Sequence, residues 1–398
     1  MMPSEVLDRA DVVVIGGGVL GCSALHHLAA RGVDVALVER GELNREASGS
    51  NAGTLHVQMP GKHFKLNYDR ADLSATEREH VCATDRLYAE AARMWRTLEA
   101  DLGADLGVRR HGGLMVADTE ADLALLDRKS RLERPFGIET EVVTTREMLA
   151  IAPHLSERLP GAAYCPEEGF ANPLLAAPAY VRAAARRGAR VHRHARVHRI
   201  ERADGRFRVR TAAGIVEAGR VVCAAGAQTP EIAAMVGLKL PIVPHALQVM
   251  VTEPRPPALA QLIQHASRGL SLRQTPHGTF VVGGGWPAQP VAADGERPQT
   301  VLSSIAGSAR VFQDILPCAA DARVIRAWAG MTTATGARNR VGFVGEYARQ
   351  PGFYVLMAGG WGFALSPVLG RLLAELLVEG APSLPLDEFS VARWAETA

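Results

Sequence analysis

Asp11-Val-Val-Val-Ile-Gly16-Gly-Gly18-Val-Leu-Gly21 is an apolar run that ends in glycines, and a second apolar run, Val35-Ala-Leu-Val38, ends at Glu39. A strand, a glycine-rich turn, a helix and a second strand ending in an acid form the βαβ unit that binds dinucleotides. The three numbered glycines permit, in order, a sharp turn, close approach of backbone N–H groups to a pyrophosphate, and tight packing of helix on strand. Because the acid can accept hydrogen bonds from both ribose hydroxyls, FAD or NAD fits better than NADP.

The composition is that of a globular protein with enough material for two domains. The chain has 398 residues, of which 47% are hydrophobic, and a formal net charge of +2. It has no basic block, so we expect no nucleic-acid partner. The first ten residues do not resemble a secretory signal, and no apolar run looks long enough to cross a bilayer. We therefore expect a cytoplasmic protein without a membrane span.

The cysteines argue against metal and disulfide chemistry. They are scattered, with no CxxC or Cys/His spacing, at Cys22, Cys82, Cys165, Cys223 and Cys318. We therefore expect no metal site and no disulfide oxidoreductase activity.

Segments typical of a dinucleotide-binding domain occur at the start, middle and end of the chain. Helices are predicted at 71–103, 119–134, 145–151, 174–187 and 297–316, and strands at 196–202, 206–211, 219–226, 323–330 and 353–357, with longer strands in 241–290. Asp204-Gly205 predicts a hairpin turn, and a final helix is predicted from Pro367 to Glu379. Because a nicotinamide dehydrogenase usually keeps its binding unit contiguous, this layout favours a flavoprotein.

Five blocks spread over the chain resemble the FAD-dependent D-amino-acid oxidase superfamily, in the branch that contains glycine oxidase and sarcosine oxidase. They are Gly16 to Gly21 with Glu39, Ser48-Gly-Ser-Asn-Ala-Gly53, Glu168-Gly-Phe-Ala-Asn-Pro173, Val221 to Gly226, and Ala358-Gly-Gly-Trp-Gly362. The resemblance implies an α/β fold with a Rossmann-like FAD-binding domain from residues 1–58, 169–240 and 321–398. It also implies a substrate domain on a mixed or antiparallel sheet from residues 59–168 and 241–320.

The same resemblance implies a set of FAD-binding residues. These are Gly16, Gly18, Val19, Leu20, Gly21, Glu39, Arg40, Ser48, Gly49, Asn51, Ala52, Gly53, Thr54, Val197, Ala225, Gly226, Gly330, Gly359, Gly360, Trp361, Gly362 and Phe363. In such proteins the helix after the last block points its N-terminus at the flavin, where its dipole stabilises negative charge. No cysteine matches the position that binds flavin covalently in monomeric sarcosine oxidase, since Cys318 precedes that region. We expect non-covalent FAD.

Three further stretches resemble the flavin subunits of opine oxidases and of hydroxyproline or proline dehydrogenases. They are Ser271-Leu-Arg-Gln274-Thr, Gly283-Gly-Gly-Trp286-Pro and Gly53-Thr-Leu-His56-Val-Gln58. Such subunits often work with partners that carry further redox centres. The narrower resemblance therefore adds partner redox subunits, or a homo-oligomer, to the expected small-molecule substrate.

One stretch departs from the glycine and sarcosine oxidase pattern. Those relatives carry an Arg after the glycine at the position of Gly330, and it binds the substrate carboxylate, whereas Met331 follows here. We consider Arg273 the first replacement, with Arg338 and Arg340 behind it, because a guanidinium binds a carboxylate through two parallel hydrogen bonds. A surface role for Arg273 is equally compatible with the sequence. His56, His245, Trp286 and Trp361 are further candidates for the pocket, and His56, Trp361 and Arg273 are the predicted catalytic residues.

The function that we predict is oxidation of a C–N bond in an amino acid or N-substituted amino acid, by hydride transfer to flavin N5, to give an imine. Candidate substrates are a D-amino acid, hydroxyproline, an opine or a sarcosine-like compound. Two alternatives stay open: a flavin subunit that passes electrons to partner subunits, and a biosynthetic amine oxidase that acts on a non-amino-acid substrate. A flavin-binding module without turnover is the alternative from a different class.

Overall fold

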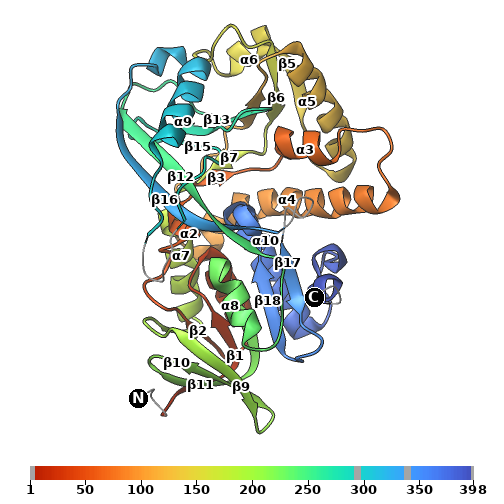
Figure 1. Cartoon of the computed structure of the whole chain (residues 1–398), viewed down its shortest axis with the longest axis vertical. Helices are drawn as coiled ribbons and strands as arrows, with labels where there is room; N and C mark the ends of the chain where they lie inside the picture. The colour runs from red at the N-terminus through yellow and green to blue at the C-terminus, as the bar shows by residue number, and fades with distance from the viewer. Residues whose placement is uncertain (1–4, 291–296, 336–341, 396–398) are drawn as a thin grey trace.

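The computed structural model describes residues 5–290, 297–335 and 342–395. In this part of the chain the strands form two eight-stranded sheets and one two-stranded sheet. Figure 1 shows the two large sheets at opposite ends of the molecule, with helices α4 (Ala75–Leu102) and α10 (Gly362–Glu379) between them. The α/β fold class with a Rossmann-like part and a second, mixed sheet is confirmed.

The first sheet has the strand order β17-β18-β11-β1-β2-β8, in which the neighbours from β18 to β8 are parallel and β17 pairs antiparallel with β18. Its strands are β1 (Val6–Ile15), β2 (Val35–Val38), β8 (Arg190–His192), β9 (Val197–Ala203), β10 (Arg206–Thr211), β11 (Gly214–Cys223), β17 (Phe343–Glu346) and β18 (Phe353–Met357). Strands β9, β10 and β11 pair antiparallel beside this core. Asp204 and Gly205 have φ angles of 54° and 77°, as the predicted hairpin turn requires.

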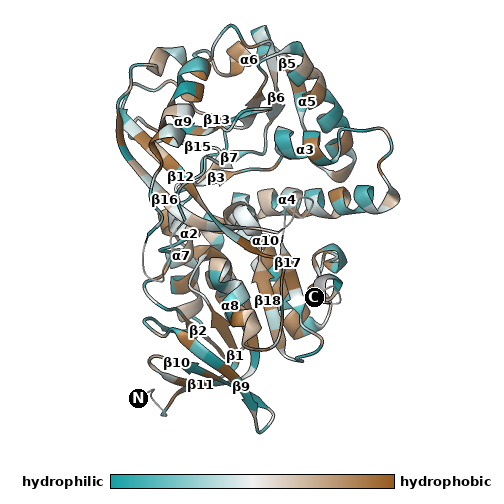
Figure 2. Ribbon diagram, viewed as in Figure 1, coloured by the Kyte–Doolittle hydropathy of each residue, from teal (hydrophilic) through white to brown (hydrophobic). Residues whose placement is uncertain are grey.

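Both faces of the central part of this sheet are buried, which explains the apolar runs at 12–15 of β1 and along β2 and β18. On β1, Val12 and Val14 belong to one core cluster, and Val13 and Ile15 to the cluster on the opposite face. Successive side chains of a strand point to opposite faces, so a strand covered on both sides lacks polar alternation. Figure 2 shows β1 and β18 largely in the hydrophobic colour, whereas α4 alternates along its length.

Helices α1 (Val19–Ala30), α7 (Pro173–Ala185) and α10 pack together against this sheet, and α8 (Thr229–Ala234) follows β11. Helix α10 begins at Gly362 and not at Pro367, so the sequence prediction was wrong by more than one turn. Pro367 has no N–H to donate to the carbonyl oxygen of Phe363, and the hydroxyl of Ser366 donates to that oxygen instead, at 2.9 Å. This local replacement lets the helix run through the proline.

The expectation that no segment is long and apolar enough for a membrane span was also wrong. Residues 359–379 meet the length and composition of a span, but 72% of their most apolar 18-residue window is buried inside the protein. The indole of Trp95 on α4 donates to the carbonyl oxygen of Ala364 at 2.8 Å, and Ser23 on α1 donates to that of Ser366 at 2.7 Å. The apolar composition of α10 is therefore that of a core helix.

The second sheet is mixed, with strand order β16-β12-β15-β14-β13-β4-β6-β5. Its strands are β4 (Gly113–Val116), β5 (Glu141–Thr144), β6 (Gly161–Cys165), β12 (Val243–Pro254), β13 (Leu262–His265), β14 (Ser271–Gln274), β15 (Thr279–Gly283) and β16 (Val324–Ala334). Only β13 and β4 pair in parallel among these neighbours. Helices α5 (Glu120–Glu133), α6 (Thr145–Ile151) and α9 (Leu302–Ile315) pack on it, close to three predicted helices.

The remaining elements of the described residues are short. They are α2 (Ala47–Ser50), β3 (Thr54–Leu55), α3 (Gly61–Asn67), β7 (Gly169–Phe170), the 3₁₀ turns η1 (Arg134–Phe136), η2 (Gly226–Gln228), η3 (Pro317–Ala319), η4 (Gly359–Trp361) and η5 (Asp387–Phe389), and α11 (Ala392–Ala395). Strand β16 lies within the range 321–398 that we predicted for the FAD-binding domain, yet it pairs with β12 of the second sheet. The division into domain ranges stays a prediction.

Candidate active site

A cavity of about 720 Å³ extends from the first sheet to the second. It is lined at one end by the turn after β1 and the ends of β2 and β11, and at the other by residues of β12, β13, β14 and β15. Strand β16, η4 and the start of α10 line it in between. This volume lies in the upper part of the range of ligand pockets, about 300–1,000 Å³.

The turn between β1 and α1 has the geometry of a pyrophosphate site. Gly16 has a φ of +114°, and a Cβ placed there would lie 2.4 Å from the carbonyl oxygen of Ala224, so only glycine fits. Gly18 is the N-cap of α1 and offers no side chain to its first-turn N–H groups. The hydroxyl of Ser48 accepts from the N–H of Val19 at 2.9 Å. The helix thus presents its positive end to the cavity, where a phosphate would be stabilised.

The carboxylate of Glu39 lies beside this turn. Its two oxygens accept from the N–H groups of Gly17 at 2.7 Å and Gly41 at 2.9 Å. Each carboxylate oxygen can accept more than one hydrogen bond, so both can also accept from ribose hydroxyls. Arg40 pairs with Glu46 at 2.7 Å at the same end of the cavity. This end fits the adenosine half of a dinucleotide.

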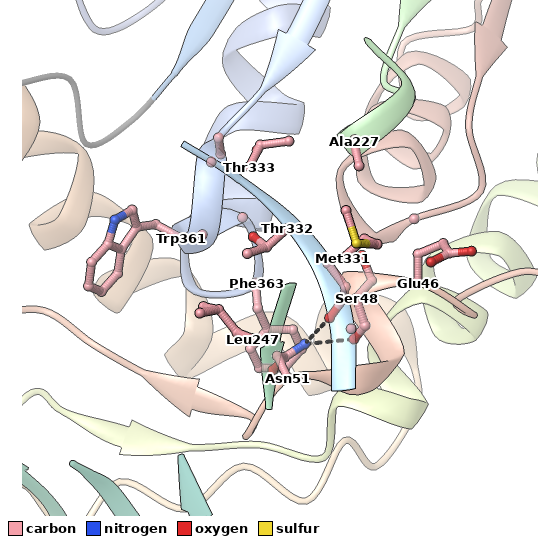
Figure 3. Close-up of a pocket in the computed structure, with 18 of the residues that line it drawn as sticks. Glu46, Ser48, Asn51, Ala227, Leu247, Met331, Thr332, Thr333, Trp361 and Phe363 are labelled. Atoms are coloured by element: carbon pink, nitrogen blue, oxygen red, sulfur yellow. Dashed lines mark hydrogen bonds between the residues drawn. The ribbon is translucent and has the colours of Figure 1, made fainter. Parts of the chain in front are cut away.

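The loop 48–54 is held by its own hydrogen bonds. The amide of Asn51 donates to the carbonyl oxygens of Ala47 at 3.2 Å and Ser48 at 2.7 Å (Figure 3), and its Oδ1 accepts from the N–H of Gly53 at 2.7 Å. Gly53 has a φ of +75°, and a Cβ there would lie 2.2 Å from the carbonyl oxygen of Ala171. The polar loop residues therefore fix a backbone shape in which residues 50–52 and 54 line the cavity.

His56 and Trp361 come together at the far end of this loop. Thr54 Oγ1 and His56 Nε2 are 2.8 Å apart, and the rings of His56 and Trp361 meet edge to face with centroids 5.5 Å apart. In Figure 3, Trp361 and Glu46 lie at opposite ends of the labelled residues, with Met331 to Thr333 of β16 between them. Strand β16 thus passes along the middle of the cavity.

Most of the predicted FAD-binding residues line this one cavity. They are Gly16, Gly18, Val19, Leu20, Glu39, Arg40, Ser48, Asn51, Ala52, Thr54, Val197, Ala225, Gly226, Gly330, Gly359, Gly360, Trp361, Gly362 and Phe363. Gly21, Gly49 and Gly53 are not among its lining residues. A Cβ on Gly21 would lie 2.0 Å from the carbonyl oxygen of Gly16, and one on Gly49 would lie 2.0 Å from that of Asn44. These glycines allow close backbone packing behind the cavity wall.

Arg273 also lies behind the wall. Its Nε donates to the carbonyl oxygen of Ala52 at 2.5 Å, and its guanidinium lies 5.1 Å from the ring centre of Phe170. The residue is 8% exposed, and burial lowers its pKa to about 10. Among the described residues no carboxylate pairs with it. Arg273 therefore contacts the loop at Ala52 and is not one of the lining residues, and its role as a catalytic residue stays a prediction.

Of the remaining residues that the sequence singled out, some line the cavity and others do not. His56 and His245 line the cavity, whereas Trp286 does not, and its indole donates to the carbonyl oxygen of Gly269 at 2.9 Å. Arg338 and Arg340 lie outside the described residues.

Sequence reasoning missed two groups of lining residues. One is on α3, where Lys62, His63 and Leu66 line the cavity after Pro60, and the other is on the second sheet, where Met115 and Gln264 do so. No motif marks these residues, because their position depends on strand register and on the path of a short helix.

Comparison with known proteins agrees with this geometry. The model of the FAD-dependent oxidoreductase family matches residues 11–376. The chain belongs to this family. It is 28% identical to glycine oxidase of Geobacillus kaustophilus over 97% of each chain, and 27% identical to an opine oxidase subunit of Rhizobium meliloti over 97% of this chain and 98% of that one. The family assigned from the five sequence blocks is confirmed.

Solved structures show the same fold. Glycine oxidase from Geobacillus kaustophilus superposes with a TM-score of 0.84 at 24% identity, covering 97% of this chain and 99% of that one. L-Proline dehydrogenase from P. horikoshii superposes with a TM-score of 0.82 at 23% identity, covering 97% and 98%. As a family member the chain is an FAD-dependent oxidoreductase, and FAD fits the cradle at Gly16, the open N-terminus of α1 and the acid Glu39.

Proposed function

We propose that this chain oxidises the C–N bond of an amino acid or N-substituted amino acid to an imine, which water then hydrolyses. The observation that carries the proposal is the continuity of the cavity, which joins the dinucleotide cradle of the first sheet to a chamber walled by the second. Relatives of similar length are a glycine oxidase and an opine oxidase subunit, and a sarcosine dehydrogenase of Mus musculus is 32% identical over 63% of this chain and 26% of that one. Their names all indicate amine substrates that carry a carboxylate.

The residues that would hold FAD follow from the cavity wall. The Gly16–Gly18 turn and α1 would bind the pyrophosphate, Glu39 the adenosine ribose, and loop 48–54 with η4 the flavin half. FAD, when bound, supplies the two-electron acceptor for the hydride that leaves the substrate carbon. We infer that it is held non-covalently, since Cys318 is exposed and is not a cavity residue.

Helix α10 would stabilise negative charge at the end of the cavity that holds the flavin. Its first residues, Gly362, Phe363 and Ala364, line the cavity, and no side chain caps its N-terminus at Trp361. First-turn N–H groups and the positive end of the helix dipole therefore face this region. They would stabilise negative charge that develops there during substrate oxidation.

We assign attraction of the substrate carboxylate to Lys62. Lys62 and Arg268 are the lining cations nearest the second sheet, but Arg268 already pairs with Asp118 at 2.7 Å and Asp314 at 2.8 Å. No ion pair involves Lys62 within the described ranges, and the residue is exposed on α3. A flexible lysine can reach a carboxylate as a point charge, which replaces the absent arginine after Gly330.

A second candidate function is that of a flavin subunit that transfers electrons to a partner. It is favoured by the match to the opine oxidase subunit along nearly the whole length of both chains. In that case the same amine oxidation occurs in this chain, and the acceptor is a redox centre of another subunit.

The test is anaerobic reduction of the FAD-loaded protein by a panel of amines. The panel contains glycine, sarcosine, N,N-dimethylglycine, D- and L-proline and iminodiacetate, with benzylamine as an amine that lacks a carboxylate. We expect the visible flavin absorbance to bleach with at least one amino acid and not with benzylamine. Bleaching by none of the amino acids would refute the proposal, and bleaching by benzylamine alone would favour a non-amino-acid substrate.

The two candidate functions differ in how the bleached protein is reoxidised. Rapid reoxidation by oxygen indicates an oxidase that works alone. Turnover with an artificial dye but not with oxygen indicates a dehydrogenase that needs a partner acceptor.

A further inference from the structure

A row of hydrogen-bonded neighbours crosses the second sheet and faces the cavity. Met115 on β4 lies opposite Gln264 on β13, Gln264 lies opposite Ser271 on β14, and Ser271 lies opposite Gly283 on β15. All four residues line the cavity. Directly opposed residues in a sheet have Cβ atoms about 4.5–5.5 Å apart, so the two polar side chains of this row are close enough to contact one small group.

The orientation of the Gln264 amide is fixed from behind by Glu168. Its Nε2 donates to Glu168 Oε2 at 2.7 Å, and both residues are buried. A carboxylate only accepts hydrogen bonds, so the NH₂ group of the amide must point to Glu168. The amide oxygen of Gln264 makes no hydrogen bond within the described residues and is not sealed from the cavity. It is therefore presented to the cavity as an acceptor.

Glu168 itself is surrounded by donors. Its oxygens accept from the N–H of Val57 at 2.9 Å, from the N–H of Gln58 at 3.2 Å and from Gln58 Nε2 at 3.0 Å. Although burial raises the pKa of Glu168, these donors and that of Gln264 favour its charged form. All four contacts are lost or weakened if the carboxylate is protonated.

A buried ion pair fixes Gln58 in turn. Lys129 Nζ donates to Gln58 Oε1 at 3.0 Å and to Glu133 Oε2 at 2.7 Å, while Glu133 also accepts from the N–H of Met59. The ammonium of Lys129 has only donors, so Gln58 must turn its NH₂ toward Glu168. The segment 57–59 and Gln264 are therefore held by one network with a single arrangement of donors and acceptors.

Ser271 provides the second polar group of the row. Its hydroxyl is buried and has no hydrogen-bond partner in the described protein, although the residue lines the cavity. A buried hydroxyl without a partner is unfavourable, and rotation of the Ser271 side chain toward the cavity would let a ligand satisfy it.

We propose that Gln264 and Ser271 bind the amine nitrogen of the substrate, with Glu168 as the residue that positions Gln264. The amide oxygen of Gln264 accepts an N–H of the amine, and the Ser271 hydroxyl makes the second contact. The negative charge of Glu168 behind the amide favours a positively charged or N–H-rich group at this point. This inference rests on the proposed amine oxidation and adds to it a specificity for nitrogen substitution.

The specificity follows from the chemistry of the acceptor. A primary or secondary amine keeps an N–H when it is neutral and ready to lose a hydride, whereas a neutral tertiary amine has none. We expect an extra methyl group on the substrate nitrogen to lower kcat/KM at least about 10-fold. N,N-dimethylglycine should therefore be the poorer substrate when it is compared with sarcosine.

The experiment compares Gln264→Leu, Ser271→Ala and Glu168→Gln with the wild-type holoenzyme, using the amine of the panel that bleaches the flavin fastest. For Gln264→Leu we expect a KM at least about 10-fold higher and a weaker discrimination against the N-methylated amine. Ser271→Ala should raise KM less. Gln313→Leu, at an exposed position of α9, is the matched control and should change neither constant.

Glu168→Gln tests the positioning role through its pH profile. A negative charge near the bound amine raises the pKa of that amine, so removing it should move the acidic limb of the kcat profile to lower pH. A purely structural role would lower kcat without moving this limb. FAD content and circular dichroism check that each variant is folded, and Gln264→Leu tests the inference if Glu168→Gln does not fold.

The outcomes separate this inference from the proposed function. If no amine bleaches the wild-type protein, the proposed function fails and the inference fails with it. If amines bleach the wild type while Gln264→Leu and Ser271→Ala retain its KM and its discrimination, only the assignment of the amine site is overturned.

Discussion

Arg273 on β14 donates from its Nε to the carbonyl oxygen of Ala52 at 2.5 Å. This contact ties a strand of the second sheet to the loop that follows α2, so the wall of the cavity depends on both large sheets. The guanidinium is buried and has no carboxylate partner among the described residues, which makes the loop carbonyl its main polar contact. We therefore expect it to position the loop.

The first prediction concerns Arg273→Met. The Ala52 carbonyl would lose its donor, at a cost of about 1–3 kcal/mol, and we expect the Kd for FAD to rise about 10-fold or more. Thermal stability should change less, because burying the guanidinium itself costs free energy. Titration of the apoprotein with FAD, followed by flavin fluorescence, measures the effect.

Arg199→Met is the matched control for this prediction. The Arg199 side chain is 69% exposed on β9, so its removal should leave the affinity for FAD unchanged. A raised KM for carboxylate substrates with unchanged FAD affinity in Arg273→Met would instead support a direct substrate contact.

The second prediction concerns Gly16→Ala. A methyl group there would lie 2.4 Å from the carbonyl oxygen of Ala224, at a φ of +114° that alanine rarely adopts. We expect loss of FAD from the purified protein and a lower melting temperature. Gly41→Ala is the control, because a Cβ at Gly41 has no neighbour within 4 Å. A Gly16→Ala variant that retains full FAD content would contradict this account of the turn.

The third prediction concerns Glu39→Gln. The carboxylate accepts from the N–H groups of Gly17 and Gly41 and would also accept from the ribose, whereas an amide offers one acceptor oxygen and a donor group. We expect FAD affinity to fall about 10- to 100-fold, measured by the same fluorescence titration. Glu42→Gln removes a half-exposed acid that pairs with Arg193 and should have little effect. Equal affinities for the two variants would show that Glu39 does not contact the cofactor.

The fourth prediction is acid sensitivity of helix α1. Burial lowers the pKa of His26 to about 4 and that of His27 to about 3, from an ordinary value of 6.5. Between these values and 6.5 the unfolded chain binds more protons than the folded one, so the free energy of unfolding falls as pH falls. Each histidine contributes at most about 1.4 kcal/mol per pH unit in this window.

Urea unfolding of the wild type and of His27→Gln between pH 7.5 and 5.5 measures this dependence. The variant should lose less stability over the interval, since one of the two proton-binding groups is absent. His198→Gln, on the exposed face of β9, should follow the wild type. Parallel curves for His27→Gln and the wild type would exclude His27 as a cause of the acid sensitivity.

Much of the fold followed from local patterns. The apolar runs of β1 and β2, the glycines between them and the Asp204-Gly205 turn each act through neighbouring residues, and the structure has them as predicted. The start of α10 did not follow, because the tolerance of Pro367 depends on a hydroxyl that replaces one backbone donor. Local rules about proline could not include that compensation.

The candidate site shows the same division between local and tertiary information. The sequence by itself determined the dinucleotide turn, the acid after the second strand and the family, since these are short motifs whose chemistry lies in adjacent residues. The sequence also singled out Arg273, but it did not indicate where the side chain of this residue points. Only the tertiary structure directed Arg273 to the back of the Ala52 loop and placed Gln264 and Ser271 side by side with Glu168 behind them. Strand register and long-range packing set those contacts, and neither is encoded in a local pattern.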